Sequence, residues 1–65
     1  MYDVLFLDHA HGEKVLARGL GRDDACEVAR VESRRLGVGR MFLAGSELHP
    51  GGDMVVIVES AARAA

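Results

Sequence analysis

Three histidines are the side chains best suited to metal chemistry in this chain of 65 residues. His9 and His11 follow Asp8 closely, and His49 lies in a later segment rich in glycine. Neutral imidazoles and a carboxylate suit zinc or another divalent ion. Solvated loop histidines explain the same spacing without a metal. A metal- or small-ligand-binding protein that uses His9, His11 and His49 is therefore the third hypothesis for function.

Four arginines gather at the end of a predicted helix and in the turn after it, where they could hold phosphates: Arg30, Arg34, Arg35 and Arg40. Glu27 can pair with Arg30 three residues on, so a salt-bridged solvent face explains most of this pattern. No aromatic residue interleaves the arginines, as a stacking platform for single strands requires. The formal net charge of -2 provides no global field for polyanions. A nucleic-acid accessory protein is the second hypothesis, and nucleic acid is not the default partner.

Glu32 falls near the centre of the apolar stripe of the same helix, where a carboxylate is unusual. A buried charge must find a partner or take up a proton, and the partner could be Arg35, three residues away, or an arginine of the second or third predicted strand. We predict an ion pair for Glu32 rather than a role in acid or base catalysis. The chain offers no mechanism built on a Ser/His/Asp order, a cysteine with a base or paired carboxylates. No catalytic residue and no cofactor are expected, and a non-enzymatic protein is favoured over an enzyme.

The elements that position these residues follow from apolar patterning and from the placement of glycine. The sequence predicts one α+β domain over residues 1–60, in the order ββαββ, followed by a frayed tail at 61–65. One helix packs on a four-stranded, mainly antiparallel sheet. The predicted strands are 2–8, 13–20, 40–44 and 54–59, the helix is 22–36, and Gly37 is its left-handed cap.

The predicted order of the strands across the sheet is 2-1-3-4, with every neighbour antiparallel, and the order 1-2-3-4 stays open. The second strand carries Lys14 and Arg18, which is typical of an edge guarded by charge. The long loop 45–53 contains Leu48, which is a candidate contact residue beside the ionisable His49.

Three of the predicted strands are apolar on both alternating faces, so the sheet needs a cover on each side, and one helix supplies only one. The set predicted to face the helix is Val4, Phe6, Phe42, Val55 and Ile57. The opposite set, predicted to form an interface, is Leu5, Leu7, Met41, Leu43, Met54, Val56 and Val58. A chain of this size buries only about 60% of its unfolded surface, and the single cysteine excludes an intramolecular disulfide. Self-association is the natural further source of stability.

The first hypothesis is therefore a small non-enzymatic interaction or regulatory module, a homodimer through this apolar sheet face, with another protein as the alternative partner. The start of the chain lacks the pattern of a signal peptide, and no apolar run approaches the roughly 20 residues that span a bilayer. We expect a cytoplasmic protein without membrane contact. The excess of arginine over lysine, with abundant alanine and glycine, indicates a GC-rich bacterial genome.

Overall fold

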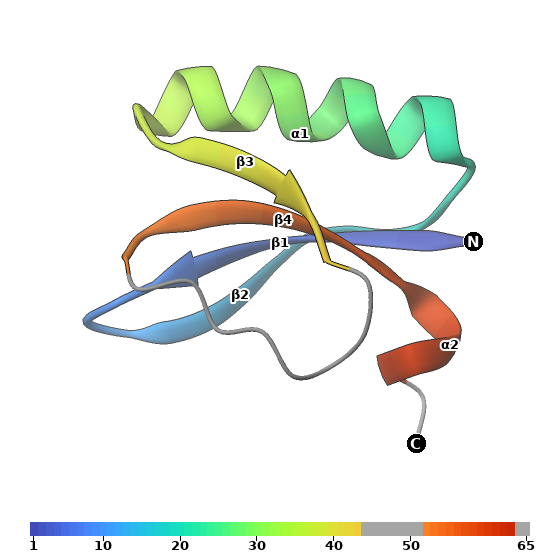
Figure 1. The fold of residues 1–65 in the computed structure, drawn as a ribbon, viewed down its shortest axis with the longest axis horizontal. Coiled ribbons are helices and arrows are strands. Elements are labelled where there is room, and N and C mark those ends of the chain that lie inside the picture. The colour runs from blue at the N-terminus through green and yellow to red at the C-terminus, as the bar shows by residue number, and fades with distance from the viewer. Residues whose placement is uncertain (44–51, 64–65) are drawn as a thin grey trace.

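A computed structural model of the chain describes residues 1–43 and 52–63. One long helix lies across a four-stranded sheet, and a single helical turn follows the last strand (Figure 1). The elements are β1 Tyr2–Asp8, β2 Gly12–Leu20, α1 Arg22–Leu36, β3 Gly39–Phe42, β4 Met54–Glu59 and α2 Ser60–Arg63. The predicted α+β fold of order ββαββ is confirmed. The predicted contact residue Leu48 lies outside the described residues, as does Ala44, the predicted end of the third strand.

Helix α1 begins and ends at the residues that local sequence signals predict. Gly21 has extended backbone angles (φ -63°, ψ 164°), and its carbonyl accepts the first helical bond from the Ala25 N–H at 2.9 Å. At the other end Gly37 adopts a left-handed conformation with φ 71°, which a residue without a Cβ takes at little cost. The N–H of Val38 then donates to the carbonyl of Ser33 at 3.0 Å, so the chain turns sharply toward β3.

The order of the strands differs from both predicted orders. The sheet runs β2-β1-β4-β3, and β3 pairs with β4 in parallel, whereas β1 is antiparallel to β2 and to β4. The predicted all-antiparallel order 2-1-3-4 is therefore wrong. Burial explains why β4 rather than β3 lies beside β1. Val55 to Val58 of β4 are all buried, whereas every residue of β3 is exposed. The strand that is apolar on both faces gains most from two neighbours, so it takes the inner position and leaves β3 at the edge.

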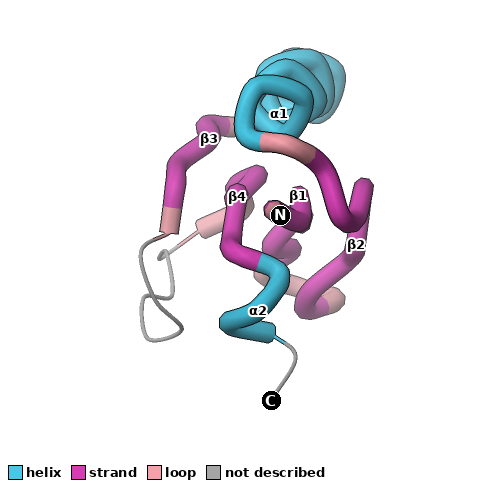
Figure 2. The backbone as a smooth tube through the Cα atoms, turned by 90° about the vertical axis from the view of Figure 1, so that its right-hand side faces the viewer, coloured by secondary structure: helices cyan, strands magenta, loops and turns pink. Residues whose placement is uncertain are grey.

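Strand β2 is irregular along its pairing with β1. The register shifts twice, once on each side of the pair Val4 and Ala17, and each shift inserts an extra residue into β2. Gly19 lies at the first irregularity with φ +65°, a conformation that side-chain-bearing residues rarely adopt. Bulges of this kind bend a strand and increase its twist. In the side view β2 follows a strongly curved path beside β1 (Figure 2).

The two faces of the sheet carry separate apolar clusters. On the helix side Val4, Val55 and Ile57 pack against Ala25 and Ala29 of α1. Both alanines are fully buried, so small side chains let the helix approach the sheet closely. The second cluster lies on the opposite face, and its buried members are Leu5, Leu43, Val56 and Val58. The predicted division of the strand residues between two faces is thus confirmed for the buried residues.

The segment after β4 overlaps the tail predicted at 61–65, of which Ala64 and Ala65 lie outside the described residues. Ser60–Arg63 form one helical turn, α2, directly after β4. The N–H of Ser60 donates to the carbonyl of Met1 at 3.0 Å, so this turn is tied to the start of β1. None of the helices in the described ranges is long and apolar enough to cross a membrane.

Candidate functional site

The turn between β1 and β2 is organised by Asp8. One oxygen of its carboxylate accepts the N–H of Ala10 at 2.9 Å, and the other lies 2.9 Å from Nδ1 of His11. The hydrogen bond from His11 is the main reason that the pKa of Asp8 lies below its ordinary value, and the bond from Ala10 adds to the effect. The backbone N–H of His9 donates to Asp53 at 2.7 Å. These bonds shape a tight turn and engage the carboxylates that a metal ion would need.

Metal binding at this turn stays a prediction. Within residues 1–43 and 52–63, no group of three histidine, cysteine, aspartate or glutamate side chains is placed to hold an ion. His49, the third predicted ligand, lies outside these ranges. His9 and His11 are both exposed in the turn. Within the described residues, His9, His11 and Asp8 are therefore not arranged as a three-ligand site.

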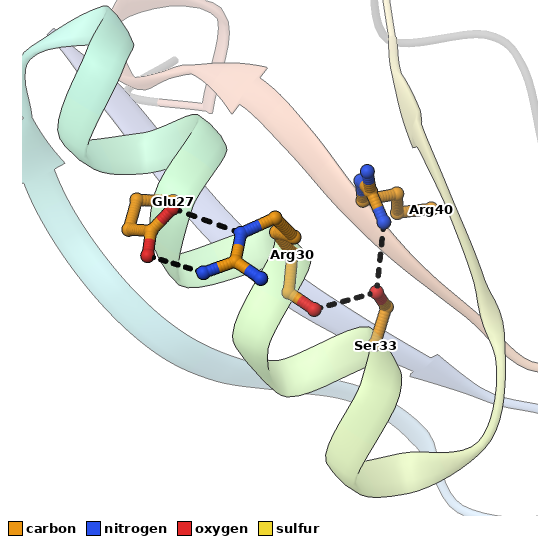
Figure 3. Close-up of polar contacts among 4 residues, drawn as sticks. All are labelled: Glu27, Arg30, Ser33 and Arg40. Atoms are coloured by element: carbon orange, nitrogen blue, oxygen red, sulfur yellow. Dashed lines mark hydrogen bonds and ion pairs between the residues drawn. The ribbon is translucent and has the colours of Figure 1, made fainter.

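Two of the four arginines lie near each other beside the edge of the sheet. Arg30 on α1 donates two hydrogen bonds to the carboxylate of Glu27, at 3.0 and 2.6 Å. Ser33, one turn on, donates to the carbonyl of Arg30 at 3.0 Å and accepts a long bond of 3.4 Å from Arg40 of β3 (Figure 3). This chain of contacts ties the outer strand to the helix. It also leaves Arg30 already paired with a carboxylate rather than open to phosphate.

The other two arginines do not complete a single cationic patch. Arg35 lies about 140° around the helix from Arg30 at 100° per residue, and it donates two hydrogen bonds to Glu32, at 2.9 and 3.0 Å. The predicted ion pair of Glu32 is therefore confirmed. Arg34 is exposed in the last turn of the helix. The predicted nucleic-acid set is thus divided between two flanks of α1, and binding of nucleic acid stays a prediction.

The pair formed by Glu32 and Arg35 is partly sheltered from solvent. The side chain of Glu32 is 23% exposed. Its pKa lies below the ordinary value, first because Arg35 donates hydrogen bonds to the carboxylate, while partial burial opposes that shift. The charges of Arg35 and of Lys14 on β2 lower the pKa further. Because the carboxylate is held in its charged form, it is unsuited to act as a general acid near neutral pH.

A small cavity of about 210 Å³ opens beside this ion pair, between the β1–β2 turn and the end of α1. Its apolar lining comes from Phe6, Leu16 and Leu36, and its polar lining includes Asp8, His11, Lys14 and Arg35. Ligand pockets usually measure about 300–1,000 Å³. Asp8 and Arg35 already pair with His11 and Glu32, so the lining does not single out one class of ligand.

The residues of the predicted interface differ widely in exposure. Four are buried within the single chain: Leu5, Leu43, Val56 and Val58. Leu7 and Met54 are half-buried, and Met41 of β3 is exposed. The face opposite the helix is therefore less open than the sequence predicts, and the accessible apolar surface shifts toward the edge strand.

Strand β3 presents apolar side chains on both of its faces at this edge. Met41 is 38% exposed and Phe42 is 39% exposed. Phe42 lies on the side of the helix, as predicted, where its ring contacts Tyr2 edge-to-face at 5.4 Å between centroids. The guanidinium of Arg22 lies 5.2 Å from the centroid of the same ring. The ring is still partly open because no further strand lies beyond β3 among the described residues.

Asp3 is a buried carboxylate that the sequence reasoning missed. It belongs to β1 and is only 5% exposed. Its Oδ1 accepts the N–H of Gly19 at 3.0 Å and the hydroxyl of Ser60 at 2.6 Å. It thereby joins the bulge of β2 to the start of α2. One signal was present: Asp3 interrupts the apolar series on the face that carries Leu5 and Leu7.

The chain was compared with known protein families, with curated proteins and with solved structures, and none of the three comparisons found a match.

Proposed function

We propose that the chain is a small non-enzymatic interaction module that forms a homodimer by adding strand β3 of one copy to β3 of another. One observation carries the proposal: β3 is an edge strand that exposes large apolar side chains on both faces, Met41 on one and Phe42 on the other. An edge strand that remains in solvent is normally protected by charge, bulges or proline. β3 has an arginine but neither a bulge nor a proline.

The backbone of β3 supports strand addition. Leu43, directly after the strand, donates its N–H to the carbonyl of Ile57 at 2.9 Å. Backbone groups alternate in direction along a strand, so Met41 and Gly39 also direct theirs toward β4. The N–H and C=O of Arg40 and Phe42 consequently point away from the sheet. These are the groups that a further strand would pair with.

Self-association through the edge strand is better supported than self-association through the sheet face predicted from the sequence. Burying an already buried side chain such as Val56 gains no further hydrophobic free energy, because that term scales with the area removed from water. Met41 and Phe42 still have such area to bury. Of the predicted interface, Met41 is thus the residue that this dimer uses most directly.

The test removes one of the two outward N–H groups of β3, that of Arg40, and leaves the pairing of β3 with β4 in place. Arg40→Pro eliminates that N–H, and proline is tolerated on an edge strand when its missing N–H faces solvent. Light scattering across a concentration series should give the mass of a dimer for the unsubstituted chain and the mass of a monomer for Arg40→Pro. Arg40→Ala loses the same charge but keeps the N–H, so it should still dimerise at higher concentration.

A second variant covers the case in which Arg40→Pro fails to fold. Met41→Glu changes an exposed side chain and would place a charge against the partner strand, so it should also give a folded monomer. Circular dichroism would verify folding of each variant. A folded original chain that stays monomeric up to millimolar concentration overturns the proposal. A dimer that survives both substitutions uses a different surface, and β3 is then excluded.

A further inference from the structure

We infer that two copies of the chain pair antiparallel along β3 in one register, with Met41 of each copy facing the other across the two-fold axis. The inference rests on the proposed function and specifies its partner and geometry. It follows from the order of the side chains in β3, Gly39–Arg40–Met41–Phe42, and from the direction of the backbone groups. In this register Arg40 of one copy lies opposite Phe42 of the other, and Gly39 lies opposite Leu43.

Backbone direction restricts the registers that are available. Arg40 and Phe42 direct their N–H and C=O groups outward, because Leu43 directs its N–H inward to Ile57. An antiparallel partner must therefore place outward residues opposite outward residues. Symmetric pairing can then centre on Arg40, on Met41 or on Phe42. A register centred between two residues is excluded, because it would place a residue whose N–H and C=O point outward opposite a residue whose groups point toward β4.

Charge distinguishes among these three registers. Centring on Arg40 places two arginines directly opposite each other, and like charges in that position destabilise a pair of strands. Centring on Phe42 places Arg40 opposite Ala44 of the partner, which offers it no complementary group. Centring on Met41 places each Arg40 opposite an aromatic ring. Only this register gives both arginines a favourable partner.

The contacts of Phe42 and Arg40 within one copy leave room for this arrangement. The ring of Phe42 has Arg22 at 5.2 Å and Tyr2 at its edge, yet it remains 39% exposed. Arg40 makes one hydrogen bond to a side chain, a long contact of 3.4 Å with Ser33. A guanidinium attracts the face of an aromatic ring within about 6 Å. The side chain of Arg40 can therefore turn to the ring across the interface at small cost.

The opposite face of the strand is also self-complementary in this register. Leu43 would lie across from Gly39, which has no side chain to oppose it, and Met41 would meet its own copy on the axis. The two outward pairs, Arg40 with Phe42 in each direction, would exchange four backbone hydrogen bonds. Met41 would then occupy a non-hydrogen-bonded pair, in which Cα atoms are about 4.5 Å apart and side chains approach most closely.

Cysteine cross-linking tests the register directly. A disulfide requires Cα atoms about 4.4–6.8 Å apart, so Met41→Cys should form a covalent dimer rapidly under mild oxidation. The variants Arg40→Cys and Phe42→Cys should each cross-link poorly alone, because equivalent residues would be offset diagonally. A mixture of these two variants should form the mixed disulfide. All variants carry Cys26→Ser, because Cys26 is exposed and would itself oxidise.

The outcomes separate the register from the proposed function. Efficient self-cross-linking at position 40 or 42, with little at 41, overturns the register. A non-covalent dimer that is sensitive to Arg40→Pro, but that forms no disulfide at position 41 or in the mixture, also overturns it and leaves the proposed function intact. A monomer by light scattering overturns both. Arg40→Ala should weaken the dimer about five- to thirtyfold, the effect of two exposed cation–π contacts.

Discussion

The two edge strands of the sheet differ in how far they are protected against pairing with a further strand. Strand β2 has nine residues, two register shifts and exposed charges at Glu13, Lys14 and Arg18. Strand β3 has four residues, an uninterrupted parallel register and two exposed apolar side chains. Bulges and charges discourage a further strand from pairing. β2 is thus protected against further pairing, whereas β3 carries less of this protection, as the proposed dimer requires.

The difference between the edges extends to how each is attached. Asp3 fastens the bulge of β2 through a buried carboxylate. β3 is joined to the helix by the long contact between Arg40 and Ser33 and by the guanidinium of Arg22 against the ring of Phe42. A buried charged hydrogen bond contributes more to stability than an exposed or long one. We expect substitutions at the β2 attachment to affect folding, and substitutions at β3 to affect association.

The largest expected effect on folding follows from removal of the Asp3 carboxylate. Asp3→Ala leaves the N–H of Gly19 and the hydroxyl of Ser60 without their acceptor. A hydrogen bond to a charged group contributes about 1.5–3 kcal/mol, and both bonds are only partly buried, so the free energy of unfolding should fall by about 2–4 kcal/mol. Urea unfolding followed by circular dichroism measures the change. Asp3→Asn keeps one acceptor oxygen, so its free energy of unfolding should fall by less than that of Asp3→Ala.

Asp53 offers a matched control, because it also accepts a backbone N–H, that of His9, but in an exposed setting. Asp53→Ala should lower the unfolding free energy by less than about 1 kcal/mol. Equal losses for Asp3→Ala and Asp53→Ala would contradict the view that burial makes the β2 attachment stronger.

A smaller effect is expected from adding one methyl group to a glycine at each edge. Gly19 has φ +65°, so Gly19→Ala strains the backbone and should cost about 1–2 kcal/mol. Gly39 lies in β3 without a positive φ, and an added Cβ would meet only Met54 at 3.8 Å, an ordinary contact. Gly39→Ala should change stability by less than about 0.5 kcal/mol. Both are measured at low concentration, where dimerisation adds nothing to stability. The reverse ranking would mean that β2 is not held in its bulged form.

Local signals made several elements predictable from the sequence. The bounds of α1 and β4 were predicted to the residue because Gly37 can take a left-handed angle and because a continuous apolar run defines β4. The division of strand residues between the two faces followed from simple alternation. The pairing of Glu32 with Arg35 followed from their spacing on one helix.

The order of the strands was not predictable in this way. A hairpin between β3 and β4 suits local sequence, whereas their parallel pairing depends on the whole path between them and on which strand gains most from two neighbours. The irregularity of β2 at Gly19 is contacted by Asp3, which lies 16 residues away in the sequence. The exposure of Phe42 follows from the edge position of β3. The predicted order placed this strand inside the sheet, so the exposure of Phe42 was not predicted.

The two ion pairs of α1 provide the smallest expected effect, because they compare a sheltered pair on the β2 flank with an exposed pair. Glu32 lies on the flank toward β2 and its side chain is 23% exposed, whereas Glu27 lies on the helix face away from the sheet and its side chain is 60% exposed. Hydrogen bonds from Arg35 and Arg30 lower the pKa of the respective carboxylates below the ordinary value of 4.5. Glu32→Gln should reduce the melting temperature at neutral pH more than Glu27→Gln does, because solvent screens the more exposed pair.

The dependence on pH distinguishes an ion pair from simple packing. A carboxylate whose pKa is lowered by folding stabilises the folded state fully above its unfolded pKa, near 4.5, and loses that contribution as pH falls through the lower folded value. The melting temperatures of the original chain and of Glu32→Gln should therefore differ at pH 7 and converge in acid, below the folded pKa. A difference that persists unchanged at low pH would assign the effect of Glu32 to packing against the β2 flank rather than to charge.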